Sequence, residues 1–126
     1  MIHHLDHLVL TTAHEEACVA FYIGALGMAL ETFDHGRKAF RFGTQKINLH
    51  VQGHEIEPKA HQPVPGSLDL CFITSMPLDE VIETLKAKGV PIVVGPVTRT
   101  GATSALRSVY VRDPDLNLIE ISEPLR

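Results

Sequence analysis

Four side chains that can bind a metal ion occur on stretches that otherwise read as β-strands: His7, His50, Asp69 and Glu120. Their neighbours along the chain are mostly apolar, and burying an imidazole or a carboxylate there costs free energy unless the group is paired or bound to a cation. Imidazole and carboxylate together suit Zn, Ni, Fe or Mn, and the absence of thiolate favours a site with exchangeable positions over a structural zinc. The four residues therefore predict one bound divalent transition metal.

Each of the four also has an ordinary structural explanation. His7 fits a hydrogen-bonded strand histidine, and His50 fits a solvated one. Asp69 is compatible with a cap or an ion pair, and Glu120 with an ion pair to an arginine such as Arg107. The sequence contains no HExxH or CxxC spacing, so only the joint placement of the four residues indicates a site.

The elements that must position these residues follow from the hydrophobic periodicity. In the first half, Thr12 followed by Glu15 is a capping-box signal, and helical spacing continues until Gly27. Alternation predicts strands on either side of this helix. These strands cover Asp6 to Thr12, Met28 to Phe33, Lys38 to Phe42 and Gln45 to Gln52.

The second half repeats this order after a proline-rich linker. The expected elements are strands at Ser67–Thr74, Ile92–Val94, Arg107–Arg112 and Leu118–Ser122, a helix at Pro77–Lys88, a polar loop at Gly95–Ala105 and a turn at Asp113–Asn117. We expect the segment from Arg99 to Arg107 to be either a mobile cover for an anionic substrate or an ordinary surface loop.

The repeated order predicts which residues correspond in the two halves. Pairing the opening strands places His7 over Asp69, an offset of 69 − 7 = 62 residues. Pairing the closing strands places His50 over Glu120, an offset of 120 − 50 = 70 residues. If the halves pack about a pseudo-two-fold axis, the four donors converge on one point.

Length and composition restrict the class of protein. The 126 residues, 44% of them hydrophobic, suit one domain, with module one at about 1–53, a linker at about 54–66 and module two at about 67–126. A formal charge of -4 argues against nucleic acid and anionic membranes as partners. No apolar stretch approaches the roughly 20 residues of a membrane span, so we expect a cytoplasmic protein, with Cys18 and Cys71 as free thiols.

Three segments resemble one known group of proteins. They are Leu5-Asp6-His7-Leu8-Val9-Leu10, then Phe21-Tyr22 before Leu26-Gly27-Met28, and finally the run from Val109 to Glu120 that contains Arg112-Asp113-Pro114-Asp115. Together they resemble the vicinal oxygen chelate superfamily, which includes glyoxalase I, bleomycin-resistance proteins and extradiol dioxygenases. The resemblance extends essentially from end to end, and the closing segment is the most specific part.

The resemblance implies an α+β fold of two tandem βαβββ modules that form a cupped, partly open, barrel-like mixed sheet around a divalent metal. It also implies a homodimer that builds each site from both chains. By similarity, His7 matches the first-strand ligand, and Glu120 matches the last-strand glutamate that also moves a proton in isomerases. His50 falls where glyoxalase I usually has a glutamate, and Asp69 falls where it usually has a histidine.

Because a histidine and a carboxylate have exchanged positions relative to glyoxalase I, several functions remain open. A glyoxalase-like lyase or isomerase with Glu120 as the base is favoured, with glutathione as a possible co-substrate. An extradiol-type dioxygenase, a fosfomycin-type thiol transferase and a metal-free protein that binds a drug or metabolite are the alternatives. In each case a small molecule is the partner. The predicted substrate-binding residues are Arg41, Asn48, Arg99, Arg107 and Tyr110.

Overall fold

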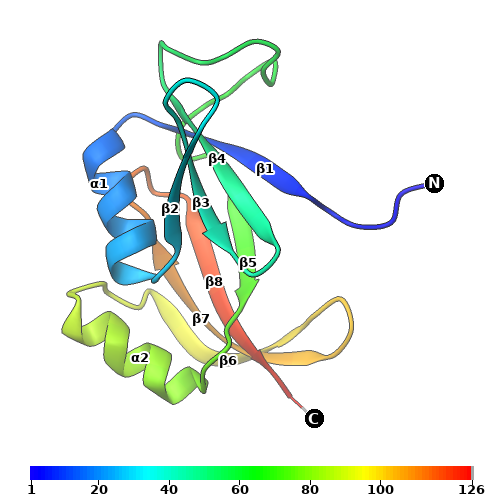
Figure 1. Cartoon of the computed structure of the whole chain (residues 1–126). Coiled ribbons are helices and arrows are strands. Elements are labelled where there is room, and N and C mark those ends of the chain that lie inside the picture. Colours follow the sequence, from blue (N-terminus) through cyan, green and yellow to red (C-terminus); the bar gives the residue numbers. More distant parts are fainter. Residues whose placement is uncertain (126) are drawn as a thin grey trace. The chain divides into compact units, whose positions relative to one another are not determined.

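The computed structural model describes residues 1–125, which form two compact units, Met1–Ser67 and a second that begins at Leu68. Each unit holds one helical segment and one four-stranded mixed sheet (Figure 1). The predicted α+β fold of two tandem modules is therefore confirmed. Neither sheet closes into a barrel within the described residues. Within the same residues, neither helical segment is long and apolar enough to cross a membrane.

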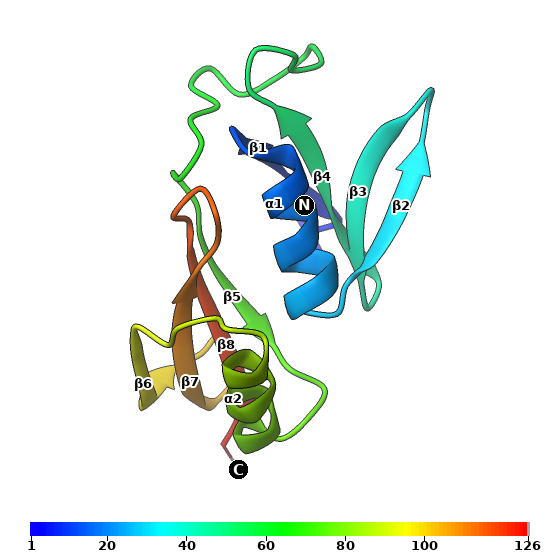
Figure 2. The same cartoon turned by 90° about the vertical axis from the view of Figure 1, so that its left-hand side faces the viewer.

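In the first unit, the helical segment and the strands follow one another along the chain in the predicted order. The elements are β1 (His7–Thr12), α1 (Glu15–Val19) continuing as the π-helix η1 (Ala20–Ala25), β2 (Ala29–Phe33), β3 (Arg37–Phe42) and β4 (Gln45–Val51). The sheet order is β1-β4-β3-β2, with β1 parallel to β4 and the other neighbours antiparallel. Figure 2 shows the whole length of the helical segment, which runs alongside this sheet.

The start of the first helix differs from the prediction. His14 is its N-cap, and no side chain caps the helix. Thr12 instead accepts a hydrogen bond on Oγ1 from the His14 backbone N–H at 3.0 Å. The predicted capping box between Thr12 and Glu15 is therefore wrong, because the helix begins two residues later than that pattern requires. Gly27 ends the segment as predicted, at a φ of +76° that favours glycine.

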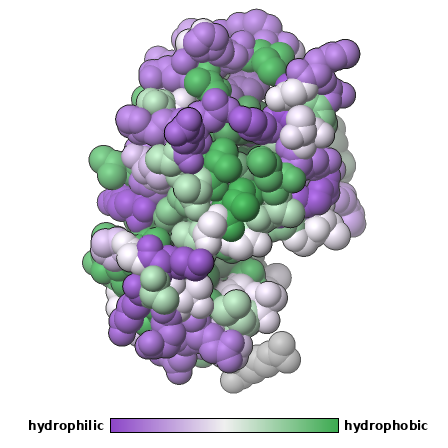
Figure 3. All heavy atoms as spheres, turned by 60° about the vertical axis from the view of Figure 1, so that its left-hand side comes forward, coloured by the Kyte–Doolittle hydropathy of each residue, from purple (hydrophilic) through white to green (hydrophobic). Residues whose placement is uncertain are grey.

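Alternation along β4 separates the core of the first unit from its polar face. Ile47 and Leu49 are buried with Phe40, whose ring stacks on Tyr22 at a centroid distance of 5.0 Å. The intervening Asn48 therefore points to the opposite face. Hydrophobic residues also gather on the face of this unit turned toward the viewer in Figure 3.

The second unit has the same element order. It consists of β5 (Asp69–Ile73), α2 (Leu78–Ala87), β6 (Val94–Thr100), β7 (Ala105–Arg112) and β8 (Leu118–Pro124), with sheet order β5-β8-β7-β6. Helix α2 packs against β7 and β8. Its residues Val81 and Leu85 are buried, as are Val109 and Ile119 on the two strands. The side chains at the odd-numbered positions of these strands therefore lie on the core side of the sheet.

The polar loop expected at Gly95–Ala105 is mostly strand, which corrects that prediction. Gly95 lies where the β6–β7 register shifts between Val94 and Val97. Its φ is +107°, and a Cβ there would lie 2.5 Å from the Ser108 carbonyl oxygen. Gly95, which indicates a loop in the sequence, thus lies at a β-bulge where the backbones of β6 and β7 come close together. Only the segment between Thr100 and Ala105 remains as a hairpin turn, so most of the segment from Arg99 to Arg107 is paired strand rather than loop.

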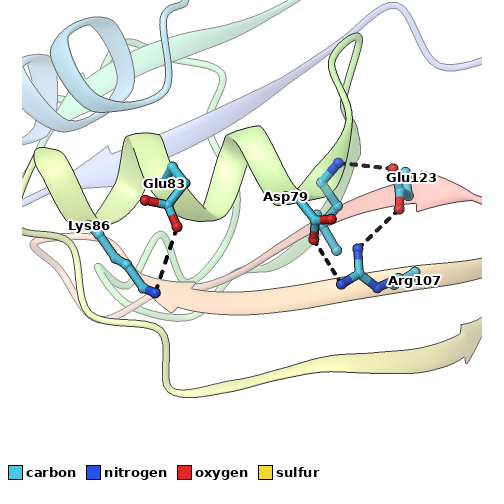
Figure 4. Close-up of polar contacts among 6 residues, drawn as sticks. Asp79, Glu83, Lys86, Arg107 and Glu123 are labelled. Carbon is cyan, nitrogen blue, oxygen red and sulfur yellow. Dashed lines mark hydrogen bonds and ion pairs between the residues drawn. The ribbon is translucent and has the colours of Figure 1, made fainter.

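An ion-pair network fixes α2 to the sheet (Figure 4). Arg107 pairs with Asp79 of α2 at 3.0 Å and with Glu123 of β8 at 3.2 Å. Glu123 also accepts a hydrogen bond from the Leu78 backbone N–H at 2.9 Å. Because the N-cap residue Pro77 has no side chain that can cap the helix, a carboxylate from β8 performs this role.

The turn predicted at Asp113–Asn117 forms and leads directly into β8. The buried Asp113 carboxylate accepts hydrogen bonds from the backbone N–H groups of Asp115 and Asn117 and from the Asn117 amide, at 2.8 to 3.0 Å. The Asn117 Oδ1 in turn accepts the Leu68 N–H at 2.8 Å. The most specific segment of the sequence therefore holds the start of β5 beside the start of β8.

Candidate functional site

The second sheet presents a polar face on the side opposite α2. In the ladders, Glu120 of β8 lies between Cys71 of β5 and Tyr110 of β7. Asp69 is two residues before Cys71, so strand alternation places it on the same face. The two predicted carboxylate ligands of this unit are therefore neighbours on one surface.

A pocket of about 400 Å³ opens on this face. It brings two carboxylates together with two cationic side chains and an aromatic ring. Its lining residues are Asp69, Val93, Val94, Arg99, Tyr110, Arg112, Leu118 and Glu120. Four predicted site residues thus line one cavity: Asp69, Arg99, Tyr110 and Glu120.

Glu120 is held by a chain of hydroxyl groups. Ser122 donates a hydrogen bond to Glu120 Oε2 at 3.2 Å, and Ser108 lies 2.6 Å from the same Ser122 hydroxyl. The Cys71 Sγ lies 3.4 Å from that hydroxyl as well. Partial burial raises the pKa of the Cys71 thiol, the negative charge of Glu120 adds to this effect and the Ser122 hydrogen bond opposes it. Without a bound metal, Cys71 is therefore a thiol rather than a thiolate.

Arg99 and Tyr110 form a pair at the other side of the pocket. Arg99 donates from Nε to the Tyr110 hydroxyl at 2.9 Å, and its guanidinium lies 5.4 Å from the centre of the same ring. The arginine is thereby held over a pocket wall without a carboxylate partner among the described residues. A fixed, unneutralised guanidinium suits binding of an anionic group.

In the first unit, His7 has a partner that orients it. The Asp6 carboxylate lies 2.9 Å from His7 Nδ1, and this hydrogen bond is the main reason that the pKa of Asp6 is lowered. A carboxylate on Nδ1 leaves Nε2 as the free ring nitrogen, which is the usual arrangement behind a metal-bound histidine. About half of the His7 side chain is exposed.

His50 lies on the same face as His7 but is buried, with 4% of its surface exposed. Burial, followed by the positive charge of Arg37, lowers the pKa of His50, and the negative charge of Glu55 opposes this. The imidazole is therefore neutral at physiological pH, as a metal ligand must be. The ladder pairs His7 with Lys46 and Thr11 with His50, so the two histidines are four positions apart, about 13 Å along the strands.

The strand registers change the predicted correspondence between the two halves. His7 and Asp69 are the first residues of β1 and β5, and they pair with Lys46 and Leu118. The residues two positions beyond these partners are Asn48 in β4 and Glu120 in β8. Asn48, rather than His50, is therefore the counterpart of Glu120, which corrects the offset of 70 residues to 120 − 48 = 72.

The remaining predicted substrate-binding residues are distributed over different surfaces. Arg41 shares the face of His7 and pairs with Glu31 at 2.9 Å. Asn48 shares that face and is buried. Arg107 lies on the α2 side of its sheet, away from Glu120, because residues 107 and 110 of one strand point to opposite faces.

Sequence reasoning did not find Asp6 as the partner of His7, nor Arg37 as the neighbour of His50. For Asp6, its position next to a predicted ligand was an available signal. For Arg37 there was none, since its role depends on the pairing of β3 with β4. Over residues 1–125, three or more His, Cys, Asp or Glu side chains do not gather into a group that could hold a metal ion.

Comparison with known proteins adds independent information. The profile of the Glyoxalase/Bleomycin resistance protein/Dioxygenase superfamily matches residues 4–121. Virulence protein STM3117 from Salmonella typhimurium is 54% identical over 123 residues, covering 98% of this chain and 85% of that protein. The glyoxalase domain-containing protein RDO1 from Mycosarcoma maydis is 51% identical over 118 residues, covering 94% of this chain but only 66% of that protein.

Solved structures agree with these matches. The crystal structure of STM3117 has a TM-score of 0.97 at 53% identity and covers 99% of both chains. A lactoylglutathione lyase from Agrobacterium tumefaciens has a TM-score of 0.70 at 23% identity, covers 95% of this chain and 92% of its own, and so shares the fold. On the profile match, the close relatives and the two βαβββ modules, this chain belongs to the Glyoxalase/Bleomycin resistance protein/Dioxygenase superfamily.

Proposed function

We propose that this protein is a divalent-metal-dependent enzyme that binds two neighbouring oxygens of a small substrate, as a glyoxalase-like lyase or isomerase. The observation that carries the proposal is the pocket in which Asp69 and Glu120 face Tyr110 and Arg99. Two carboxylates close together on one sheet, without a basic residue between them, are suited to a cation.

The proposed metal ligands are Asp69 and Glu120 from the second unit and one histidine from the first, His7 or His50, because these two lie about 13 Å apart along the strands and do not reach the same ion. The chemistry of this set fits Zn, Ni, Fe or Mn, since it combines an imidazole with two carboxylates. The hydrogen bond to Asp6 orients His7, and the lowered pKa of His50 supports His50 as a neutral donor.

Glu120 is the proposed base. Its Oε2 accepts the Ser122 hydrogen bond, which fixes the carboxylate and leaves Oε1 for a substrate proton. A bound divalent ion would supply stabilisation of negative charge on the substrate oxygens. The Arg99–Tyr110 pair would bind an anionic part of the substrate and orient the carbon that loses its proton.

The register supports a second candidate function. Asn48 stands where symmetry with Glu120 would require a carboxylate, and a neutral amide is a poor transition-metal ligand. The cup would then bind a drug or metabolite without metal or turnover. This candidate shares the pocket but requires no role for Glu120 as a base.

Metal analysis of the purified protein separates the two candidates. We expect close to one transition ion per chain for the enzyme and none for the binding protein. Activity is then tested with the hemithioacetal of methylglyoxal and glutathione, with catechol and oxygen, and with fosfomycin and a thiol, which distinguish isomerase, dioxygenase and transferase.

Two glutamine variants complete this experiment. Glu120→Gln should abolish turnover of whichever substrate reacts while metal remains partly bound. The matched variant Glu83→Gln, which alters an exposed carboxylate of α2 outside the pocket, should retain activity. Full activity of Glu120→Gln would exclude the proposed base.

A further inference from the structure

Two serines on adjacent strands of the second sheet are fully buried next to the proposed base. Ser108 of β7 and Ser122 of β8 are cross-strand partners, and the next pair on the same face is Tyr110 with Glu120. Both serines are 0% exposed, whereas Glu120 is partly exposed and lines the pocket. Burying two hydroxyl groups costs free energy unless hydrogen bonds compensate for the lost water. The serines are shielded from any ligand, but they lie one residue pair away from the carboxylate that lines the pocket.

The three side chains form a hydrogen-bond chain that runs in one direction. An ionised carboxylate only accepts, so Ser122 donates its single hydroxyl proton to Glu120 Oε2, at 3.2 Å. The Ser122 oxygen must then be the acceptor in its 2.6 Å contact with the Ser108 hydroxyl. Ser108 is therefore the donor that starts the chain.

The two hydrogen bonds differ in length, which gives Ser108 a specific role. A bond between two hydroxyl-type oxygens is commonly about 2.7–2.8 Å long. The Ser108–Ser122 bond is shorter than this, and the Ser122–Glu120 bond is longer. The long bond alone holds the Ser122 hydroxyl weakly, so Ser108 supplies most of its orientation. A donor to the Ser122 oxygen also polarises the Ser122 O–H group, which strengthens its bond to the carboxylate.

We propose that Ser108 is a positioning residue for Glu120, which acts through Ser122 to keep Oε2 occupied as an acceptor, so that only Oε1 is available to a ligand. Its relevance to catalysis rests on the proposed function, in which Glu120 is the base. In that reaction the proton taken from the substrate is held on Oε1, because Oε2 already accepts the Ser122 proton. A role of Ser108 in packing alone predicts no link between its hydroxyl and Glu120.

A double-mutant cycle in the metal-free full chain tests this link without any need for turnover. Ser108→Ala, Glu120→Ala and the double variant are unfolded in urea. Coupling between the two positions must pass through Ser122, which bonds to both side chains. We expect Ser108→Ala to lower the folding equilibrium constant roughly threefold to tenfold more in the wild-type background than in Glu120→Ala. The difference should disappear when the cycle is repeated in a Ser122→Ala background.

Kinetics test the consequence for catalysis, with the substrate whose turnover Glu120→Gln abolishes. Ser108→Ala should lower kcat roughly threefold to tenfold and leave KM and metal content unchanged, because Ser108 contacts neither the substrate nor the metal. Ser108→Thr keeps the hydroxyl and should retain kcat. Ser104→Ala is the matched control, since it removes a hydroxyl that is bonded to the Ala105 carbonyl oxygen in the adjoining hairpin, and it should also retain kcat.

Four results would overturn the proposal. They are the absence of coupling between Ser108 and Glu120, coupling that persists without Ser122, an unchanged kcat in Ser108→Ala, and an equal loss of kcat in Ser108→Thr and Ser108→Ala, which would assign the effect to packing. Failure of the proposed function is distinguishable, because it appears as absence of metal or as full activity of Glu120→Gln. The urea cycle then still decides whether Ser108 positions the carboxylate.

Discussion

Asn48 occupies, in the parallel ladder of the first sheet, the register position that Glu120 occupies in the second. The two halves are therefore alike in backbone but not in donor chemistry, since one presents an amide and the other a carboxylate. Of these two equivalent positions, only the one on β8 carries a carboxylate that can act as a base.

The two histidines should contribute unequally to metal binding. His7→Gln should lower metal affinity more than His50→Gln, because His7 is oriented by Asp6, and His50 lies about 13 Å further along the ladder. Metal content after dialysis against a graded series of chelator concentrations measures both variants. A larger loss in His50→Gln would reverse this order and make His50 the principal imidazole donor.

Removing the charge that orients His7 should weaken the metal site without unfolding the protein. Asp6→Asn is expected to lower metal affinity by about 10- to 100-fold, because the Nδ1 partner fixes the tautomer and the ring position. Competition with a metallochromic chelator measures the change. Glu57→Gln, which alters an exposed carboxylate paired with Lys59, is the control and should bind metal normally.

The Asp113 carboxylate should be a major source of stability in the second unit. Asp113→Ala leaves two backbone N–H groups and the Asn117 amide without their acceptor, so we expect a loss of about 2–4 kcal/mol in the free energy of unfolding. Urea denaturation measures it. The exposed Glu80→Ala should change stability by less than about 0.5 kcal/mol. Similar values for the two variants would show that the turn tolerates loss of the carboxylate.

Gly95 should be the least replaceable glycine of the sheet. Gly95→Ala introduces a Cβ 2.5 Å from the Ser108 carbonyl oxygen in addition to the strain of a positive φ. Gly53→Ala shares the positive φ, here +86°, but meets nothing within 4 Å, so its cost should stay at about 1–2 kcal/mol. Thermal unfolding should therefore place Gly95→Ala clearly below Gly53→Ala, and equal melting temperatures would contradict the close backbone approach.

His50 should make the metal-free protein sensitive to mild acid. Its folded-state pKa is lowered from the ordinary 6.5, so below that pH the unfolded chain binds a proton that the folded chain resists. The contribution is fully present above about pH 6.5 and is lost as the pH falls toward the folded pKa. Urea unfolding across this range should show a decline that His50→Gln reduces and that the exposed His54→Gln leaves unchanged.

The sequence alone determined what depends on neighbouring residues. Alternation in β4 predicted that Ile47 and Leu49 would be buried and that Asn48 and His50 would face the other way, and the structure confirms both. The turn at Asp113 and the helix end at Gly27 also followed from local chemistry. These signals are readable because strand alternation and turn formation act over a few residues.

Tertiary structure decided what depends on pairing between distant segments. The counterpart of Glu120 is set by the β1–β4 and β5–β8 registers, which an offset along the chain does not reveal. Gly95 read as a loop residue because its close contact with Ser108 exists only after β6 pairs with β7. Arg37 could be recognised as a neighbour of His50 only from the β3–β4 ladder. Strand register and charge neutralisation arise from contacts between residues far apart in the chain. Local sequence patterns therefore predict the helices and strands but not the arrangement of the site residues.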